Sequence, residues 1–145
     1  MIQFECDCSH DRLPMDQVTD YLRKTYWSEN IRPELVRTGF EKSVVVGAYE
    51  VGTGTFLGAA RAVSDHARFA YLCDVFVLEP YQGNGIATAM IKHLMDQPEL
   101  SYVGHWILAT KDAHAVYAKL GFEPANERYM KMTLAPERWK DKLEV

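Results

Sequence analysis

Long hydrophobic runs are absent from this chain of 145 residues. No apolar stretch approaches the roughly 18 residues of a membrane-spanning helix, and the N-terminus lacks the basic and then hydrophobic pattern of a secretory signal. Basic residues are not in excess, and the formal net charge of −4 argues against nucleic acid or an anionic membrane as the main partner. Three cysteines, an odd number, do not make a disulfide framework. These absences predict a cytoplasmic protein with no membrane or nucleic-acid partner.

Linkers, repeats and low-complexity segments are also missing, so we expect one domain over residues 1–145. Hydrophobic residues make up 48% of the chain and charged residues 25%, as in an ordinary globular domain. Antiparallel strands followed by a βαβα run predict an α+β sheet with helices on both faces. The expected strands are 1–5, 43–50, 55–63, 67–78, 102–109 and 128–134, and the expected helices follow Pro14 and Pro33 or span 85–96 and 112–120.

A glycine loop at residues 82–87 is the most informative segment. An apolar run at 75–78 leads into it, and apolar residues then recur at helical spacing from Ile86 to Met95. This order predicts a diphosphate site, because the first-turn N–H groups of a helix lack partners and glycine lets a phosphate approach the backbone. The alternative is an ordinary turn in which Gly83 and Gly85 only permit positive φ.

Two common phosphate loops do not fit this segment. A P-loop needs a lysine after its second conserved glycine, but Ile86 follows Gly85. A dinucleotide fingerprint needs glycine or alanine three residues after Gly85, where this chain has Thr88. The pattern that fits is Gln-x-x-Gly-x-Ala at residues 82–87.

A second motif follows about 30 residues later, at 108–124. It combines helical spacing, Tyr117 and the sequence Leu-Gly-Phe, in which Gly121 is the expected helix stop. The two motifs, in this order, resemble the acetyl-coenzyme-A loop and the second cofactor-contacting segment of the GNAT superfamily of N-acetyltransferases. The resemblance implies the GNAT fold, a mostly antiparallel sheet in which the strand before the glycine loop and the strand after its helix splay apart around the pantetheine arm.

The same resemblance implies acetyl-CoA as the cosubstrate and direct acetyl transfer to an amine. The backbone N–H of Val77 or Phe76 would bind the thioester oxygen. Thr110 stands near the place of a family asparagine that contacts pantetheine, and its hydroxyl is the weaker substitute. The implied cofactor-binding residues are Phe76, Val77, Gln82, Gly83, Asn84, Gly85, Ile86, Ala87 and Thr110.

Acyl transfer also needs an acid for the leaving thiolate and a route for the proton lost from the amine. By resemblance Tyr117 is the candidate acid, although its ring could instead only pack the helix onto the sheet. Asp74 interrupts an apolar strand and is either the general base or an acid paired with a neighbouring strand. His114 could relay a proton, bind a coenzyme amide or lie on the surface.

The acceptor is not encoded by any motif. A primary amine of a small molecule is the first expectation, a protein or peptide amine the second, and a non-catalytic acyl-CoA sensor the competing class. A homodimer is left open. Tyr26 and Trp27 lie where the family covers its acceptor pocket, with core packing as the alternative. Cys6 and Cys8 alternate along a strand, but no second cluster completes a zinc site, so no metal is expected.

Overall fold

The computed structural model describes residues 2–125, 127–133 and 138. In this part of the chain, five strands form one sheet in chain order, with β1 to β4 antiparallel and β5 parallel to β4. The predicted α+β sheet is therefore confirmed. The strands are β1 (Phe4–Asp7), β2 (Val44–Glu50), β3 (Phe56–Ser64), β4 (Phe69–Val77) and β5 (His105–Ile107).

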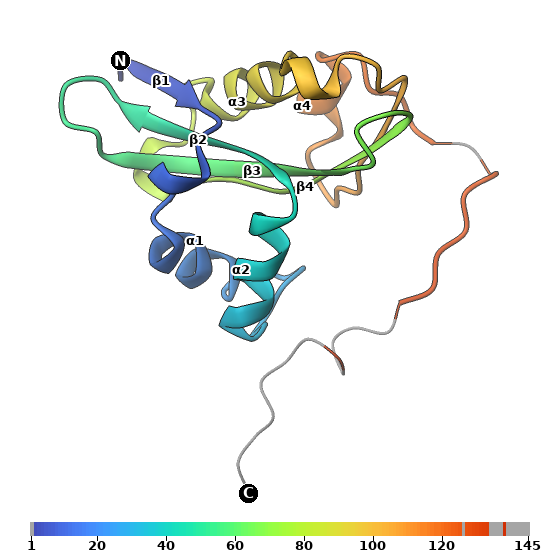
Figure 1. Cartoon of the computed structure of the whole chain (residues 1–145), viewed down its shortest axis with the longest axis horizontal. Coiled ribbons are helices and arrows are strands. Elements are labelled where there is room, and N and C mark those ends of the chain that lie inside the picture. Colours follow the sequence, from blue (N-terminus) through green and yellow to red (C-terminus); the bar gives the residue numbers. More distant parts are fainter. Residues whose placement is uncertain (1, 126, 134–137, 139–145) are drawn as a thin grey trace, which may run out of the picture.

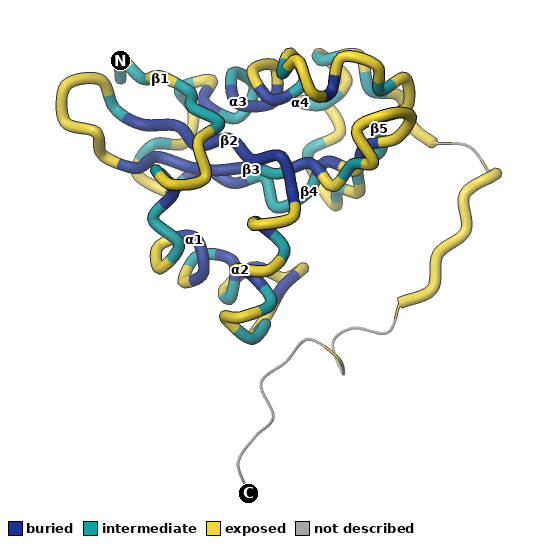
Figure 2. The backbone as a smooth tube through the Cα atoms, in the orientation of Figure 1, coloured by how far each residue is buried: buried dark blue, intermediate teal, exposed yellow. Residues whose placement is uncertain are grey.

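Helices cover both faces of this sheet (Figure 1). One face carries α1 and α2, whose Leu22 and Phe40 are buried in one apolar cluster with Phe76 of β4. The other face carries α3, whose buried Met90 and Leu94 pack on β2 and β3, and the sheet between the two layers is the most buried part of the chain (Figure 2). The helices are α1 (Met15–Leu22), α2 (Pro33–Glu41), α3 (Ile86–Met95), α4 (His114–Ala118) and the 3-10 turns η1 (His10–Arg12), η2 (Glu79–Tyr81) and η3 (Pro98–Leu100).

The last strand, predicted at residues 128–134, is wrong for residues 128–133. Residues 128–133 form neither strand nor helix, and residue 134 lies outside the described part of the chain. Met130 and Met132 are 95% and 84% exposed, so the alternation that suggested a strand buries nothing here. A strand needs a bonded neighbour as well as a pattern. Its nearest candidate, β5, has only three residues.

The strands β4 and β5 pair over a short stretch and then part. Their register runs from Phe69 opposite His105 to Tyr71 opposite Ile107, where β5 ends. β4 continues to Val77 with β3 alone beside it. This is the splayed opening that the family resemblance implied, and the glycine loop lies at its end. None of the helices in the described ranges is long and apolar enough to cross a membrane.

Candidate active site

A bulge in β4 shapes one side of the opening. Ala59 lies opposite Phe76, whereas Arg61 lies opposite Cys73, so β4 has one residue more than β3 between these pairs. Asp74 lies at this bulge with a φ of 52°, in the left-handed region that few non-glycine residues adopt. The bulge reverses the alternation of side chains along β4 and lets the carboxylate point toward the face that carries α1 and α2.

Two side chains hold the Asp74 carboxylate. The Nε of Arg61 on β3 donates to Oδ2 at 2.7 Å, and the indole Nε1 of Trp27 donates to Oδ1 at 2.9 Å. The ion pair is largely buried, with side-chain exposures of 20% for Arg61 and 11% for Asp74. Arg61 also donates to the hydroxyl of Ser43 at 3.0 Å. The pairing with a neighbouring strand is thus present, and the role of general base stays a prediction.

The backbone of Val77 faces the opening. In an antiparallel ladder, residues that bond to the facing strand alternate with residues that point away from it. The N–H of Leu78 donates to the carbonyl of Leu57 at 2.8 Å, so the neighbouring N–H of Val77 points away from β3, toward the side on which β5 has ended. The N–H of Phe76 points toward β3. Of the two thioester donors expected from sequence, Val77 has the suitable direction.

The glycine loop has the conformation that a phosphate site needs. Gly83 and Gly85 have φ values of 83° and 76°, and Gly85 is the N-cap of α3. A Cβ built on either glycine would meet nothing within 4 Å, so the space against this backbone is open to a ligand. Ala89 donates to the carbonyl of Gly85 at 3.2 Å, and the N–H groups before it in the first turn have no intrahelical acceptor.

The side-chain amides of Gln82 and Asn84 bond to backbone carbonyls and hold this loop in place. The Nε2 of Gln82 donates to the carbonyl of Val77 at 2.9 Å, which joins the loop to the end of β4. The Nδ2 of Asn84 donates to the carbonyl of Tyr81 at 2.8 Å. The side chain of Ile86 is buried in the core, 2% exposed. These residues can therefore reach a diphosphate through their backbone N–H groups.

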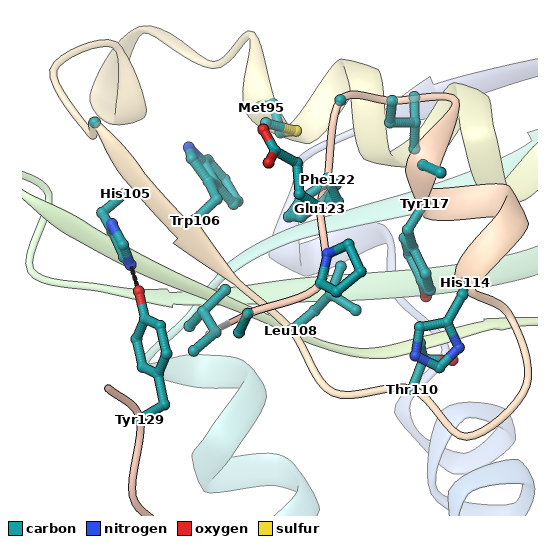
Figure 3. Close-up of a pocket in the computed structure, with 17 residues that line it drawn as sticks. Met95, His105, Trp106, Leu108, Thr110, His114, Tyr117, Phe122, Glu123 and Tyr129 are labelled. Atoms are coloured by element: carbon teal, nitrogen blue, oxygen red, sulfur yellow. Dashed lines mark hydrogen bonds between the residues drawn. The ribbon is translucent and has the colours of Figure 1, made fainter. Parts of the chain in front are cut away.

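Three predicted residues gather around α4, where a cavity of about 620 Å³ lies beside β5. Thr110, His114 and Tyr117 line the same end of it (Figure 3). Thr110 Oγ1 accepts the N–H of Ala113 at 3.1 Å and so positions the start of the helix. Burial, and secondarily the neighbouring Tyr26, raises the pKa of Tyr117, which keeps its hydroxyl protonated at neutral pH. Neither Asp74 nor the glycine loop lines this cavity.

The segment between α1 and α2 joins these two sides of the site. Tyr26 packs edge-on against Trp27, with ring centroids 5.1 Å apart, and lies under the ammonium of Lys111 at 5.3 Å. Tyr26 is 60% exposed and Trp27 36%, so core packing is wrong for both. Lining of an acceptor pocket stays a prediction.

Arg61 is a residue that sequence reasoning missed, and a signal for it existed. It is the one charged residue in the apolar run of β3, just as Asp74 is in β4, and two isolated opposite charges in consecutive strands favour a cross-strand pair. Trp27 offered no such signal. In the described ranges no group of three or more His, Cys, Asp and Glu side chains is arranged to hold a metal.

The chain belongs to the GNAT family of acetyltransferases, whose family model matches residues 10–122. A protein from Xanthomonas campestris pv. campestris assigned to the same family has a crystal structure with a TM-score of 0.80 and 30% identity, over 99% of this chain and 95% of its own. A Clostridium acetobutylicum protein solved with acetyl-CoA shares the fold, with a TM-score of 0.65 and 18% identity over 92% of this chain and 97% of its own.

A curated relative is similar over part of its length. The protein named "Probable acetyltransferase TAP2" from Glycine max is 29% identical over 123 residues, which cover 84% of this chain and 46% of that protein. The chain therefore spans about half the length of that relative.

Proposed function

We propose that residues 1–145 form one catalytic domain that transfers the acetyl group of acetyl-CoA to a primary amine of a small molecule. The observation that carries this proposal is the arrangement of the backbone at the end of β4 and in the loop that follows it. The N–H of Val77 faces the splayed opening, and the open glycine loop follows within the next ten residues, so one extended cosubstrate can contact both. The Clostridium acetobutylicum neighbour was solved with acetyl-CoA, which agrees with this choice.

The chain offers a partner for each charge that develops during transfer. The amine nitrogen attacks the thioester carbonyl, a C–N bond forms, the C–S bond breaks and sulfur leaves as thiolate. The N–H of Val77 donates to the carbonyl oxygen as it becomes negative. Tyr117 gives its proton to the sulfur, and its raised pKa favours the protonated form that this step needs.

The proton lost from the amine leaves on the face that carries α1 and α2. Asp74 is the candidate acceptor, since each carboxylate oxygen keeps a lone pair beyond the bond that it makes to Arg61 or Trp27. His114 is the second candidate, because it lines the same end of the cavity as Tyr117 (Figure 3). A small amine can reach the thioester past Tyr26 and Trp27, whose exposed rings border this side.

A thiol-release assay tests the proposal. The purified chain is incubated with acetyl-CoA and a panel of primary amines, and mass spectrometry identifies the acetylated product. Tertiary amines of similar size are the matched controls, because they cannot form a stable amide. We expect release with at least one small primary amine and none with its tertiary counterpart. Faster release with peptide amines would favour a protein acceptor, and tight coenzyme binding without any release would favour a sensor.

A further inference from the structure

Gly58 lies directly opposite Val77 in the ladder between β3 and β4. It is buried, and a Cβ built on it would collide with the carbonyl oxygen of Phe76 and come within 3.0 Å of the Cα of Val77. Both are backbone atoms of the facing strand, so no rotamer change can make room. The two strands therefore approach each other here more closely than any other residue would allow.

Other glycines do not share this environment. A Cβ on Gly47 would meet the ring of Tyr49, a side chain of the same strand β2, and not the backbone of β4. Gly83 and Gly85 have open space around them and are required for their positive φ. The φ of Gly58 is not in the left-handed range, so glycine is needed there only because β4 approaches so closely.

We propose that Gly58 is a positioning residue that sets where the N–H of Val77 meets the thioester oxygen. This inference rests on the proposed function. A methyl group at position 58 must push the end of β4 away from β3, and the backbone of Val77 moves with it. The glycine loop is fastened to the carbonyl of Val77 through Gln82, yet its own turn is set locally by Gly83 and Gly85. The displacement should therefore affect the thioester donor more than the diphosphate site.

The variant Gly58→Ala tests this with probes that need no identified acceptor. Nuclear magnetic resonance follows the backbone amide of Val77 as acetyl-CoA or CoA is added. In the unmodified protein we expect acetyl-CoA, but not CoA, to shift the Val77 proton downfield, since only acetyl-CoA carries the thioester carbonyl. In Gly58→Ala we expect that difference to disappear while the affinity for CoA changes less than about threefold. With an amine found by the thiol-release assay, kcat should fall about 10- to 100-fold and KM for acetyl-CoA little, the effect typical of a misplacement near 1 Å.

Gly52→Ala is the matched control, because it adds the same methyl group in the turn between β2 and β3, where nothing lies within 4 Å of an added Cβ and the cost is confined to its own positive φ. It should retain the difference between acetyl-CoA and CoA. If Gly58→Ala also retains it, or keeps its full kcat, Gly58 does not position Val77. If Val77 in the unmodified protein does not distinguish the two ligands, the thioester assignment itself fails. A Gly58→Ala chain that is unfolded in buffer is measured again in trimethylamine N-oxide, which favours the compact state. A chain still unfolded there would make Gly58 a requirement of the whole fold and overturn the specific role.

Discussion

Replacing Asp74 by asparagine separates an anchoring role from a catalytic one. The substitution removes the charge opposite Arg61. Because Arg61 and Trp27 donate to different oxygens of the carboxylate, one of these donors would face the NH2 group of asparagine and lose its acceptor. Breaking a buried ion pair costs about 3–5 kcal/mol. Because the Arg61 side chain is 20% exposed and keeps its bond to Ser43, we expect a loss nearer 2–3 kcal/mol. In a domain of this size that corresponds to a fall in Tm of about 5–10 °C.

Calorimetry measures this loss, with Asp20→Asn as the matched control. Asp20 is exposed on α1, so the same substitution there should change the free energy of unfolding by less than about 0.5 kcal/mol. Steady-state rates with a reactive amine, taken across pH, report on catalysis separately. If Asp74 is also the base, the turnover deficit of the variant shrinks as the pH approaches the pKa of the amine.

An unchanged Tm in Asp74→Asn would refute the anchoring argument. The double variant Arg61→Met with Asp74→Asn gives a second check. It removes the cation that lacks a counter-charge, while asparagine tolerates the positive φ and keeps an acceptor for Trp27, so it should recover part of the lost stability. A double variant less stable than Asp74→Asn would mean that the pair contributes more than the cost of leaving Arg61 without its counter-charge.

Three further predictions concern the loop, the acid and the thiols. Gly85→Asp should weaken acetyl-CoA binding by at least about 2 kcal/mol in calorimetry, whereas Gly85→Asn, equal in size but uncharged, should weaken it less. Equal losses would mean that charge at the loop is irrelevant. Tyr117→Phe should leave the Tm nearly unchanged and lower turnover at least about 100-fold when chemistry limits the rate; full turnover would return Tyr117 to a packing role. Burial raises the pKa of Cys8 and Cys73 to about 12, so at pH 8 both should react with iodoacetamide far more slowly than in the unfolded chain, and equally fast alkylation would contradict this.

Features set by local sequence could be predicted. The turn at the glycine loop follows from Gly83 and Gly85, because only their own backbone torsions are involved, and α3 follows from apolar spacing over one short window. The strands β2, β3 and β4 begin and end within two residues of the expected positions for the same reason. The family resemblance added the splayed opening, which no local pattern shows.

Features set by contacts between distant segments could not be predicted from the sequence. The bond from Trp27 to Asp74 joins residues 47 apart in sequence, and the need for glycine at position 58 depends on how closely two strands approach. The expected strand at 128–134 failed for a related reason. Alternation of apolar and polar residues describes what a strand would bury, and it carries no information about whether a neighbour is there to pair with it.

The strain at Asp74 links these distant contacts to the thioester donor. A non-glycine residue with positive φ costs on the order of 1–3 kcal/mol, and it persists only where the surroundings hold it. Hydrogen bonds to a charged group contribute roughly 1.5–3 kcal/mol each, so the bonds from Arg61 and Trp27 are together sufficient to offset that cost. Loss of either bond would remove much of the margin that holds the bulge. Since Val77 follows three residues later on the same strand, we expect the position of its N–H to respond to the loss of an indole that the segment between α1 and α2 supplies.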